Sequence, residues 1–227
     1  MDTNIVYDIA VWLVPLVIAI VFHEVAHGLV ARRLGDPTAE RKGRLSLNPI
    51  RHVDPFGTVI LPMILAISHA PVFGWAKPVP VNYRLLRRPR RDMVLVALAG
   101  PGMNLLLAIV GTAILTATII ASGGARTGAA AFVAANALNF VLINIFLAVF
   151  NLLPVPPFDG GHVVEGLLPE TLARPFRKIG RYSLLVLVGL LLVLPALAPG
   201  ADVVARIVSP IVGAVTRLLL GAFGLHL

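Results

Sequence analysis

Two histidines and a glutamate lie inside an apolar stretch near the N-terminus. In VFHEVAHGLV, residues 21–30, His23 and His27 are four residues apart and Glu24 follows the first histidine. On a helix this spacing places both imidazoles on one face, where they can bind one metal ion. Glu24 is rotated by about 100° and can reach a metal-bound water without binding the metal itself. The HExxH pattern therefore predicts a zinc site with Glu24 as general base.

The pattern is short enough to arise by chance, and histidines near a helix end can also direct their rings to a membrane interface. A membrane location weakens both alternatives. Three ionisable groups buried together in an apolar span are costly unless they bind something or one another. The apolar surroundings of His23, Glu24 and His27 thus favour metal chemistry.

A catalytic zinc usually has a third protein ligand, and Asp159 in FNLLPVPPFDGGH is the candidate. Prolines that end regular helix precede it and glycines with a permissive backbone follow it: Pro154, Pro156, Pro157, Gly160 and Gly161. An unwound chain of this kind can turn Asp159 toward the histidines. The alternative is an ordinary proline–glycine turn in which Asp159 caps the next helix.

Several other polar residues have both a functional and a structural interpretation. Asn151, eight residues before Asp159, could stabilise an oxyanion on a peptide carbonyl, or could simply form a hydrogen bond between helices. For Asn104, in AGPGMN, a bond between closely packed helices is favoured. His52 and Asp54 precede Pro55 in a basic loop, so a turn is favoured over a second metal site. His162 could contact a ligand of the metal.

The composition places these residues in a membrane protein. Of 227 residues, 58% are hydrophobic and 13% charged, and the mean hydropathy is +0.90. Apolar stretches that approach or exceed the length of a bilayer span recur along the chain. They cover about 5–34, 57–73, 93–121, 129–155, 183–197 and 203–225. The chain has no cysteine, which excludes disulfides and thiolate metal sites.

The basic residues predict an orientation. Sixteen of the 19 Lys and Arg residues lie in three loops, six in 32–51, six in 77–91 and four in 174–181. Cytoplasmic loops are the basic ones, so the N-terminus is expected outside and the second stretch, 57–73, is expected to enter and return. The prolines of GWAKPVPVN allow at most an edge strand there. Because the arginines flank apolar stretches, the net charge of +8 does not point to nucleic acid.

We therefore predict an all-α polytopic membrane protein with about five spanning helices. A re-entrant or short β element is expected between the first and second full spans. Residues 1–227 are expected to form a single integral membrane domain. Within it, the catalytic core covers about 5–165 and a C-terminal helical hairpin about 183–225.

Three segments together resemble the site-2 protease family of intramembrane zinc metalloproteases. They are HEVAH in the first span, AGPGMN in a middle span and NLLPVPPFDGG at the end of a later span, in that order. The chain looks like the compact subgroup without PDZ or CBS domains. The resemblance implies one Zn²⁺ per chain held by His23, His27 and Asp159. It also implies that Glu24 is the general base and acid, and that Asn151 holds the substrate or its oxyanion.

The resemblance also implies a function. Proteins of this family cleave transmembrane segments of other membrane proteins near the cytoplasmic side, in regulated intramembrane proteolysis. The expected partners are transmembrane protein substrates and the lipid bilayer, with homo-oligomers left open. The expected location is the plasma membrane of a prokaryote, with multiple passes and the active site near the cytoplasmic face. Two other functions remain open, an ion-binding membrane transporter and an inactive scaffold of the same family.

Overall fold

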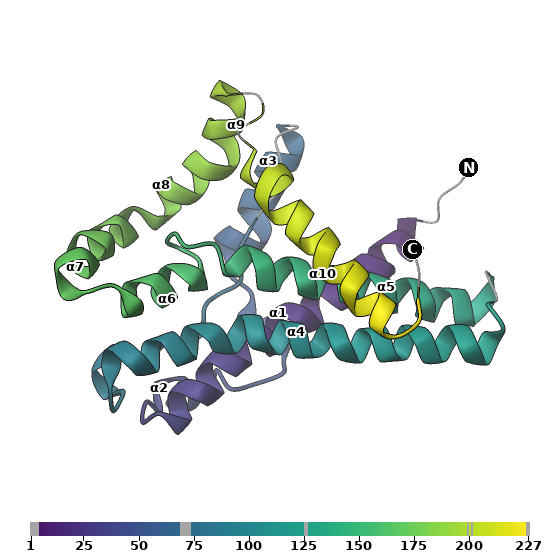
Figure 1. Ribbon diagram of the computed structural model, residues 1–227, viewed down its shortest axis with the longest axis horizontal. Coiled ribbons are helices and arrows are strands. Elements are labelled where there is room, and N and C mark those ends of the chain that lie inside the picture. The colour runs from purple at the N-terminus through teal and green to yellow at the C-terminus, as the bar shows by residue number, and fades with distance from the viewer. Residues whose placement is uncertain (1–4, 69–73, 125–126, 199, 201, 226–227) are drawn as a thin grey trace.

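The computed structural model describes residues 5–68, 74–124, 127–198, 200 and 202–225, and all regular elements in these ranges are helical (Figure 1). The first part of the chain forms α1 (Ile5–Arg33), α2 (Thr38–Arg41), η1 (Pro49–His52), η2 (Pro55–Ile60), α3 (Leu61–Ile67) and η3 (Tyr83–Leu85). The remainder forms α4 (Pro89–Ser122), α5 (Gly128–Asn151), α6 (Asp159–Leu167), α7 (Glu170–Ile179), η4 (Gly180–Tyr182), α8 (Ser183–Val188), η5 (Gly189–Val193), α9 (Leu194–Leu197), η6 (Val204–Val208) and α10 (Ser209–Ala222).

Five of the helical segments are long and apolar enough to cross a membrane, by length and composition alone. They are Ile9–Arg33, Pro89–Ser122, Gly128–Asn151, Glu170–Leu197 and Val204–Ala222. The predicted number of spanning helices is thus confirmed among the described residues. Their outward faces carry large apolar side chains, such as Trp12 and Ile120, which are 55% and 75% exposed. Exposed apolar side chains on long helices are suited to contact with lipid.

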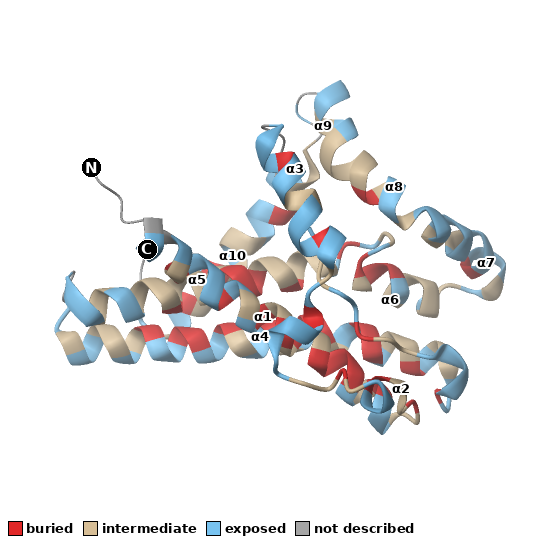
Figure 2. Ribbon diagram, turned by 180° about the vertical axis from the view of Figure 1, so that it is seen from behind, coloured by how far each residue is buried: buried red, intermediate tan, exposed pale blue. Residues whose placement is uncertain are grey.

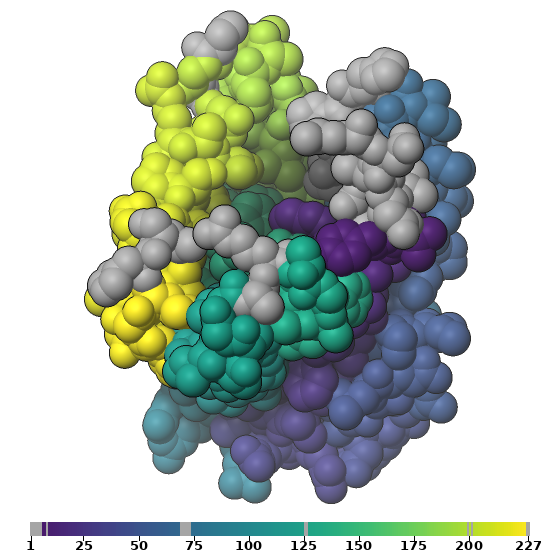
Figure 3. Space-filling model, turned by 90° about the vertical axis from the view of Figure 1, so that its right-hand side faces the viewer, coloured from purple at the N-terminus to yellow at the C-terminus, as the bar shows by residue number. Residues whose placement is uncertain are grey.

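The long helices α1, α4 and α5 form the centre of the molecule. Helices α4 and α5 lie side by side and antiparallel, and α1 crosses them (Figure 1). Figure 2 shows that buried residues concentrate where these three helices meet. Close approach of α4 to α5 depends on Gly111, where a Cβ would lie 2.9 Å from the Phe140 ring and 3.1 Å from Val141. Seen end-on, α4 and α5 lie between α10 on one side and α1 on the other (Figure 3).

The segment between α1 and α4 differs in part from its prediction. The stretch expected at 57–73 forms a short helical unit, Pro55–Ile67, too short to span a bilayer as a helix. No strand occurs in the described residues between α3 and α4, so the short β element is not found there. Residues 69–73, part of the expected re-entrant turn, lie outside the described residues. Re-entry itself stays a prediction.

Residues 74–82 run without regular structure and are held by side chains instead of a strand ladder. The buried Arg44 guanidinium donates to the Lys77 carbonyl at 2.6 Å, and the Asn82 N–H donates to the fully buried Asp36 carboxylate at 2.5 Å. Pro78 and Pro80 have no N–H to give to a ladder. We call residues 77–82 the strap, because both ends are fixed against the segment that follows α1.

The C-terminal third of the chain begins at the end of α5. Helix α6 returns along the start of α4, where Arg90 donates to the Leu168 carbonyl. In both ribbon views the segment α7–α9 and the segment η6–α10 run in different directions (Figures 1 and 2). Buried Val208 packs with Leu153 and Phe158 beyond the end of α5, and Leu220 packs with Leu115 and Ala137. Helix α10 thus extends the buried centre formed by α4 and α5.

Candidate metal centre

His23 and His27 lie on the face of α1 that packs against α4. The helix brings them together as the spacing predicts, with their Nε2 atoms 3.0 Å apart. His23 and His27 are only 7% and 9% exposed. Two imidazole nitrogens therefore meet in a buried position within a segment long enough to span a membrane.

Asp159 reaches the histidines from the first residue of α6. Its Oδ2 atom lies 3.3 Å from His23 Nε2 and 3.4 Å from His27 Nε2. This oxygen is buried and has no hydrogen-bond partner among the described residues. The structure thus brings together the two half-sites predicted from separate parts of the sequence. They form a group of three possible metal ligands, His23, His27 and Asp159.

The position of Asp159 depends on a tightly folded connection after α5. The Phe158 side chain is 5% exposed and packs edge-on against Phe150, with 4.6 Å between ring centroids. Helix α5 ends at Asn151, before the prolines, as expected. A buried aromatic anchor directly before Asp159 limits how far the carboxylate can move.

Gly160 and Gly161 serve a different purpose from the one predicted. Both are within α6, and neither has a positive φ angle, so an unusual backbone conformation is not what requires glycine. A Cβ on Gly160 would overlap the carbonyl of Leu152, and one on Gly161 would lie 2.8 Å from Pro156 N. The glycines instead let α6 start directly against the end of α5.

Helix α4 supplies the space for the imidazoles. A Cβ on Gly100 would lie 2.5 Å from His23 Cε1 and would overlap His27 Nε2. Glycine is therefore the residue that leaves room for both rings between α1 and α4. The sequence pattern of α4 does not indicate this role, because the AGPGMN segment predicts only close packing of helices.

Helix α4 also fixes the outer nitrogen of each imidazole. His27 Nδ1 lies 2.7 Å from the Val96 carbonyl, which can only accept, so Nδ1 carries the proton. His23 Nδ1 lies 2.5 Å from Asn104 Oδ1. With both protons on Nδ1, the two Nε2 lone pairs point at each other and at the Asp159 oxygen. This is the tautomer in which imidazole binds a metal.

These three atoms fit a metal ion. An ion held tetrahedrally at about 2.0–2.1 Å has ligand atoms about 3.3 Å apart, and the observed separations are 3.0–3.4 Å. Two imidazoles and a carboxylate are a ligand set that zinc accepts, with a fourth position left for water or substrate. The unpartnered Asp159 Oδ2 and the facing lone pairs are otherwise unfavourable, because three acceptors would adjoin without a donor or cation.

Glu24 lies beside this group and is held by the strap. The N–H of Val79, a residue 7% exposed, donates to Glu24 Oε2 at 2.7 Å. Val79 lies between Pro78 and Pro80, so its N–H is the one donor of this short stretch. A Cβ on Gly28 would lie 2.9 Å from the Val79 side chain, so glycine lets the strap lie close to α1. One carboxylate oxygen of Glu24 is thereby fixed.

The other candidates do not belong to the group of three ligands. The Asn151 amide donates to the Leu147 carbonyl of its own helix at 2.9 Å. The Asp54 carboxylate accepts from Gly57 N at the start of η2, and His52 Nε2 lies 2.8 Å from the Ser46 carbonyl, so the predicted turn is confirmed. The exposed His162 does not belong to the metal group.

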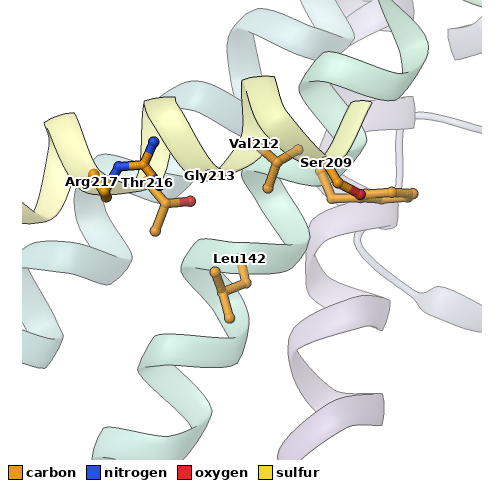
Figure 4. Close-up of a pocket in the computed structure, with 7 residues that line it drawn as sticks. Leu142, Ser209, Val212, Gly213, Thr216 and Arg217 are labelled. Atoms are coloured by element: carbon orange, nitrogen blue, oxygen red, sulfur yellow. The ribbon is translucent and has the colours of Figure 1, made fainter. Parts of the chain in front are cut away.

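A groove elsewhere on the molecule is separate from these residues. It has a volume of about 420 Å³, lies between α5 and α10 (Figure 4), and does not include the proposed ligands. Its lining residues are Leu142, Phe146, Ser209, Val212, Gly213, Thr216 and Arg217.

The close fit around Gly100 gives a direct test of the metal centre. We expect Gly100→Ala to lower zinc affinity by about tenfold or more, because the added methyl displaces one or both imidazoles. The measurement is a competition titration of detergent-purified protein with a zinc chelator. Gly102→Ala is the matched control, since a Cβ there meets no atom within 4 Å. Equal zinc affinity in both variants would contradict the geometry.

Comparisons with known proteins agree with this site. The family profile of Peptidase family M50 matches residues 11–126 and 117–194. The chain is 35% identical over 224 residues to "Putative zinc metalloprotease YwhC" of Bacillus subtilis, covering 93% of this chain and 98% of that protein. It is 32% identical over 191 residues to "Putative zinc metalloprotease Rip2" of Mycolicibacterium smegmatis, covering 83% and 67%. No solved structure matches the chain significantly. The chain belongs to Peptidase family M50, the site-2 protease family, and is a membrane metalloprotease.

Proposed function

We propose that this protein is a zinc-dependent intramembrane endopeptidase that hydrolyses peptide bonds within transmembrane segments of other membrane proteins. The observation that carries the proposal is the convergence of His23, His27 and Asp159 on one buried point, with Glu24 beside them. These residues would hold one zinc ion per chain. When bound, zinc supplies a water of lowered pKa and polarises the scissile carbonyl.

In this proposal Glu24 moves the protons. Its carboxylate accepts a proton from the attacking water and returns it to the amine of the leaving peptide. The Val79 N–H occupies Oε2, which leaves Oε1 for the water. Asn151 is proposed to steady the substrate carbonyl. It would have to exchange its present bond to the Leu147 carbonyl for one to the substrate.

The basic residues support a proposed site toward the cytoplasmic side of the membrane. His23 and His27 are in the second half of α1, Gly100 is near the start of α4, and Asp159 follows the end of α5. Basic residues follow along the same two long helices: Arg32 and Arg33 in the last turn of α1, and Arg90 and Arg91 at the start of α4. The positive-inside rule then favours cleavage near the cytoplasmic side of a prokaryotic plasma membrane, with the N-terminus outside.

Cleavage that depends on Glu24 tests the proposal. The protein would be produced in bacterial membranes with a panel of tagged single-pass proteins whose outer domains have been removed. We expect a shortened fragment with wild type, and at least 100-fold slower cleavage with Glu24→Gln, since the glutamine cannot accept the proton. Mass spectrometry of the fragment should place the cut within the apolar segment.

Zinc content is the control for this experiment, because Glu24→Gln keeps all three ligands and should retain the metal. Two results would contradict the proposal. One is equal cleavage by wild type and Glu24→Gln. The other is cleavage confined to soluble loops. Zinc bound without any Glu24-dependent cleavage of the panel would instead favour an ion-binding transporter.

The strap gives a second prediction for the same reaction. Val79→Pro removes the N–H that holds Glu24 and should lower kcat about tenfold, with zinc content unchanged. Val81→Pro is the matched control, because Val81 also follows a proline and its N–H has no partner in the described chain. If Val81→Pro lowers kcat as much as Val79→Pro, the strap acts through its shape and not through this bond.

A further inference from the structure

We propose that Asn104 is a positioning residue for the metal. It fixes the ring and the tautomer of His23, and Asn144 in turn fixes Asn104. The inference rests on the metal site of the proposed function. It adds that α5 helps to build the site through hydrogen bonds, although α5 itself contributes none of the three ligands.

The hydrogen bonds form a chain across three helices. His23 Nδ1 on α1 lies 2.5 Å from Asn104 Oδ1 on α4. Asn104 Nδ2 donates to Asn144 Oδ1 on α5 at 2.8 Å and approaches the Ala19 carbonyl at 3.4 Å. Asn144 Nδ2 donates to the Phe140 carbonyl at 2.8 Å. Each donor nitrogen of these residues has at least one acceptor.

The backbone carbonyl of Phe140, at one end of these hydrogen bonds, decides which way each amide points. A carbonyl oxygen only accepts, so the Phe140 carbonyl requires the NH₂ of Asn144 on its side. The Oδ1 atom of Asn144 must then face Asn104, which turns the NH₂ of Asn104 toward it. The Oδ1 atom of Asn104 is left for His23, so His23 Nδ1 must be the donor. His23 Nε2 is consequently an acceptor and available to a metal.

Burial makes this arrangement rigid. Asn104 and Asn144 are both 0% exposed. A buried amide that loses its partner has no water to replace it, so alternative rotamers are strongly disfavoured. The imidazole of His23 is thus held before any metal arrives, as is typical of residues that orient metal-binding histidines.

Another asparagine shows what a purely structural bond between helices looks like in this protein. Asn139 Nδ2 on α5 donates to the Val11 carbonyl on α1 at 2.8 Å. This bond also joins two spanning helices but makes no contact with a proposed ligand. A comparison of variants at Asn104 and Asn139 therefore distinguishes a role in positioning the metal from a role in helix packing.

The experiment measures metal binding without any substrate. Detergent-purified wild type, Asn104→Leu, Asn144→Leu and Asn139→Leu would be titrated with zinc against a chelator, and their cobalt(II) forms examined by visible absorption. We expect Asn104→Leu to lower zinc affinity by about 10- to 100-fold and to alter the cobalt bands. Asn144→Leu should lower affinity by a smaller factor, and Asn139→Leu should not change it.

A double variant tests whether Asn144 acts through Asn104. Because Asn144 acts only through Asn104, adding Asn144→Leu to Asn104→Leu should not lower zinc affinity further. A folded Asn104→Leu protein with wild-type affinity and an unaltered cobalt spectrum would overturn the inference. So would an equal loss of affinity in Asn139→Leu.

If Asn104→Leu does not fold, the zinc affinity of Asn144→Leu is the deciding measurement. Wild-type zinc affinity in Asn144→Leu would then overturn the proposed series of hydrogen bonds. A wild-type protein that binds neither zinc nor cobalt would overturn the metal site and this inference together. Failure to find a cleaved substrate would affect only the proposed function, because these titrations do not use one.

Discussion

The structure depends on one interaction, the approach of three electron-rich atoms in a buried place. Two imidazole nitrogens and a carboxylate oxygen lie 3.0–3.4 Å from one another, with their protons directed elsewhere. Such an arrangement is unfavourable without a cation, and apolar surroundings increase the cost. The surrounding elements make it possible: α4 leaves room at Gly100, and the connection after α5 fixes Asp159 through Phe158. The geometry of the site thus depends directly on how the long helices pack.

Hydrogen bonds from the surrounding residues hold the imidazoles and Glu24 in place. Backbone and amide oxygens on α4 fix the outer nitrogens of the two imidazoles, and the strap holds one oxygen of Glu24. The strap is itself held by Arg44 and Asp36, two buried charged residues outside the group of possible metal ligands. Buried charges are costly unless they form hydrogen bonds, and these two form theirs with the backbone of the strap, so they favour one position of it.

Much of this arrangement could be predicted from the sequence, because the decisive residues have strong local signatures. The HExxH spacing determines how His23 and His27 face one another on a helix. The apolar stretches gave the five candidate spans, because length and hydropathy are the main requirements of a spanning helix. The helical segment of the fourth candidate span begins at Glu170, before the apolar stretch expected from 183, because its first turns are charged and escape a search for apolar stretches.

What could not be predicted are the contacts made in space by unremarkable residues. Gly100 and Asn104 read as helix-packing residues, and Asn104 does join α4 to α5, but both also adjoin the imidazoles. Gly160 and Gly161 were expected to supply backbone freedom, whereas they supply close approach. An edge strand was allowed for residues 74–83. Single contacts to Arg44, Glu24 and Asp36 hold the strap instead, and no sequence pattern indicates such contacts.

The most direct test of the central claim is X-ray absorption spectroscopy at the zinc edge of the purified protein. The account predicts zinc with two imidazole ligands and the remaining ligands oxygen, at about 2.0–2.1 Å. In Gly100→Ala protein loaded with zinc, the imidazole contribution should be reduced. Zinc bound with no imidazole, or with more than two, would contradict the assignment of His23, His27 and Asp159 as its ligands.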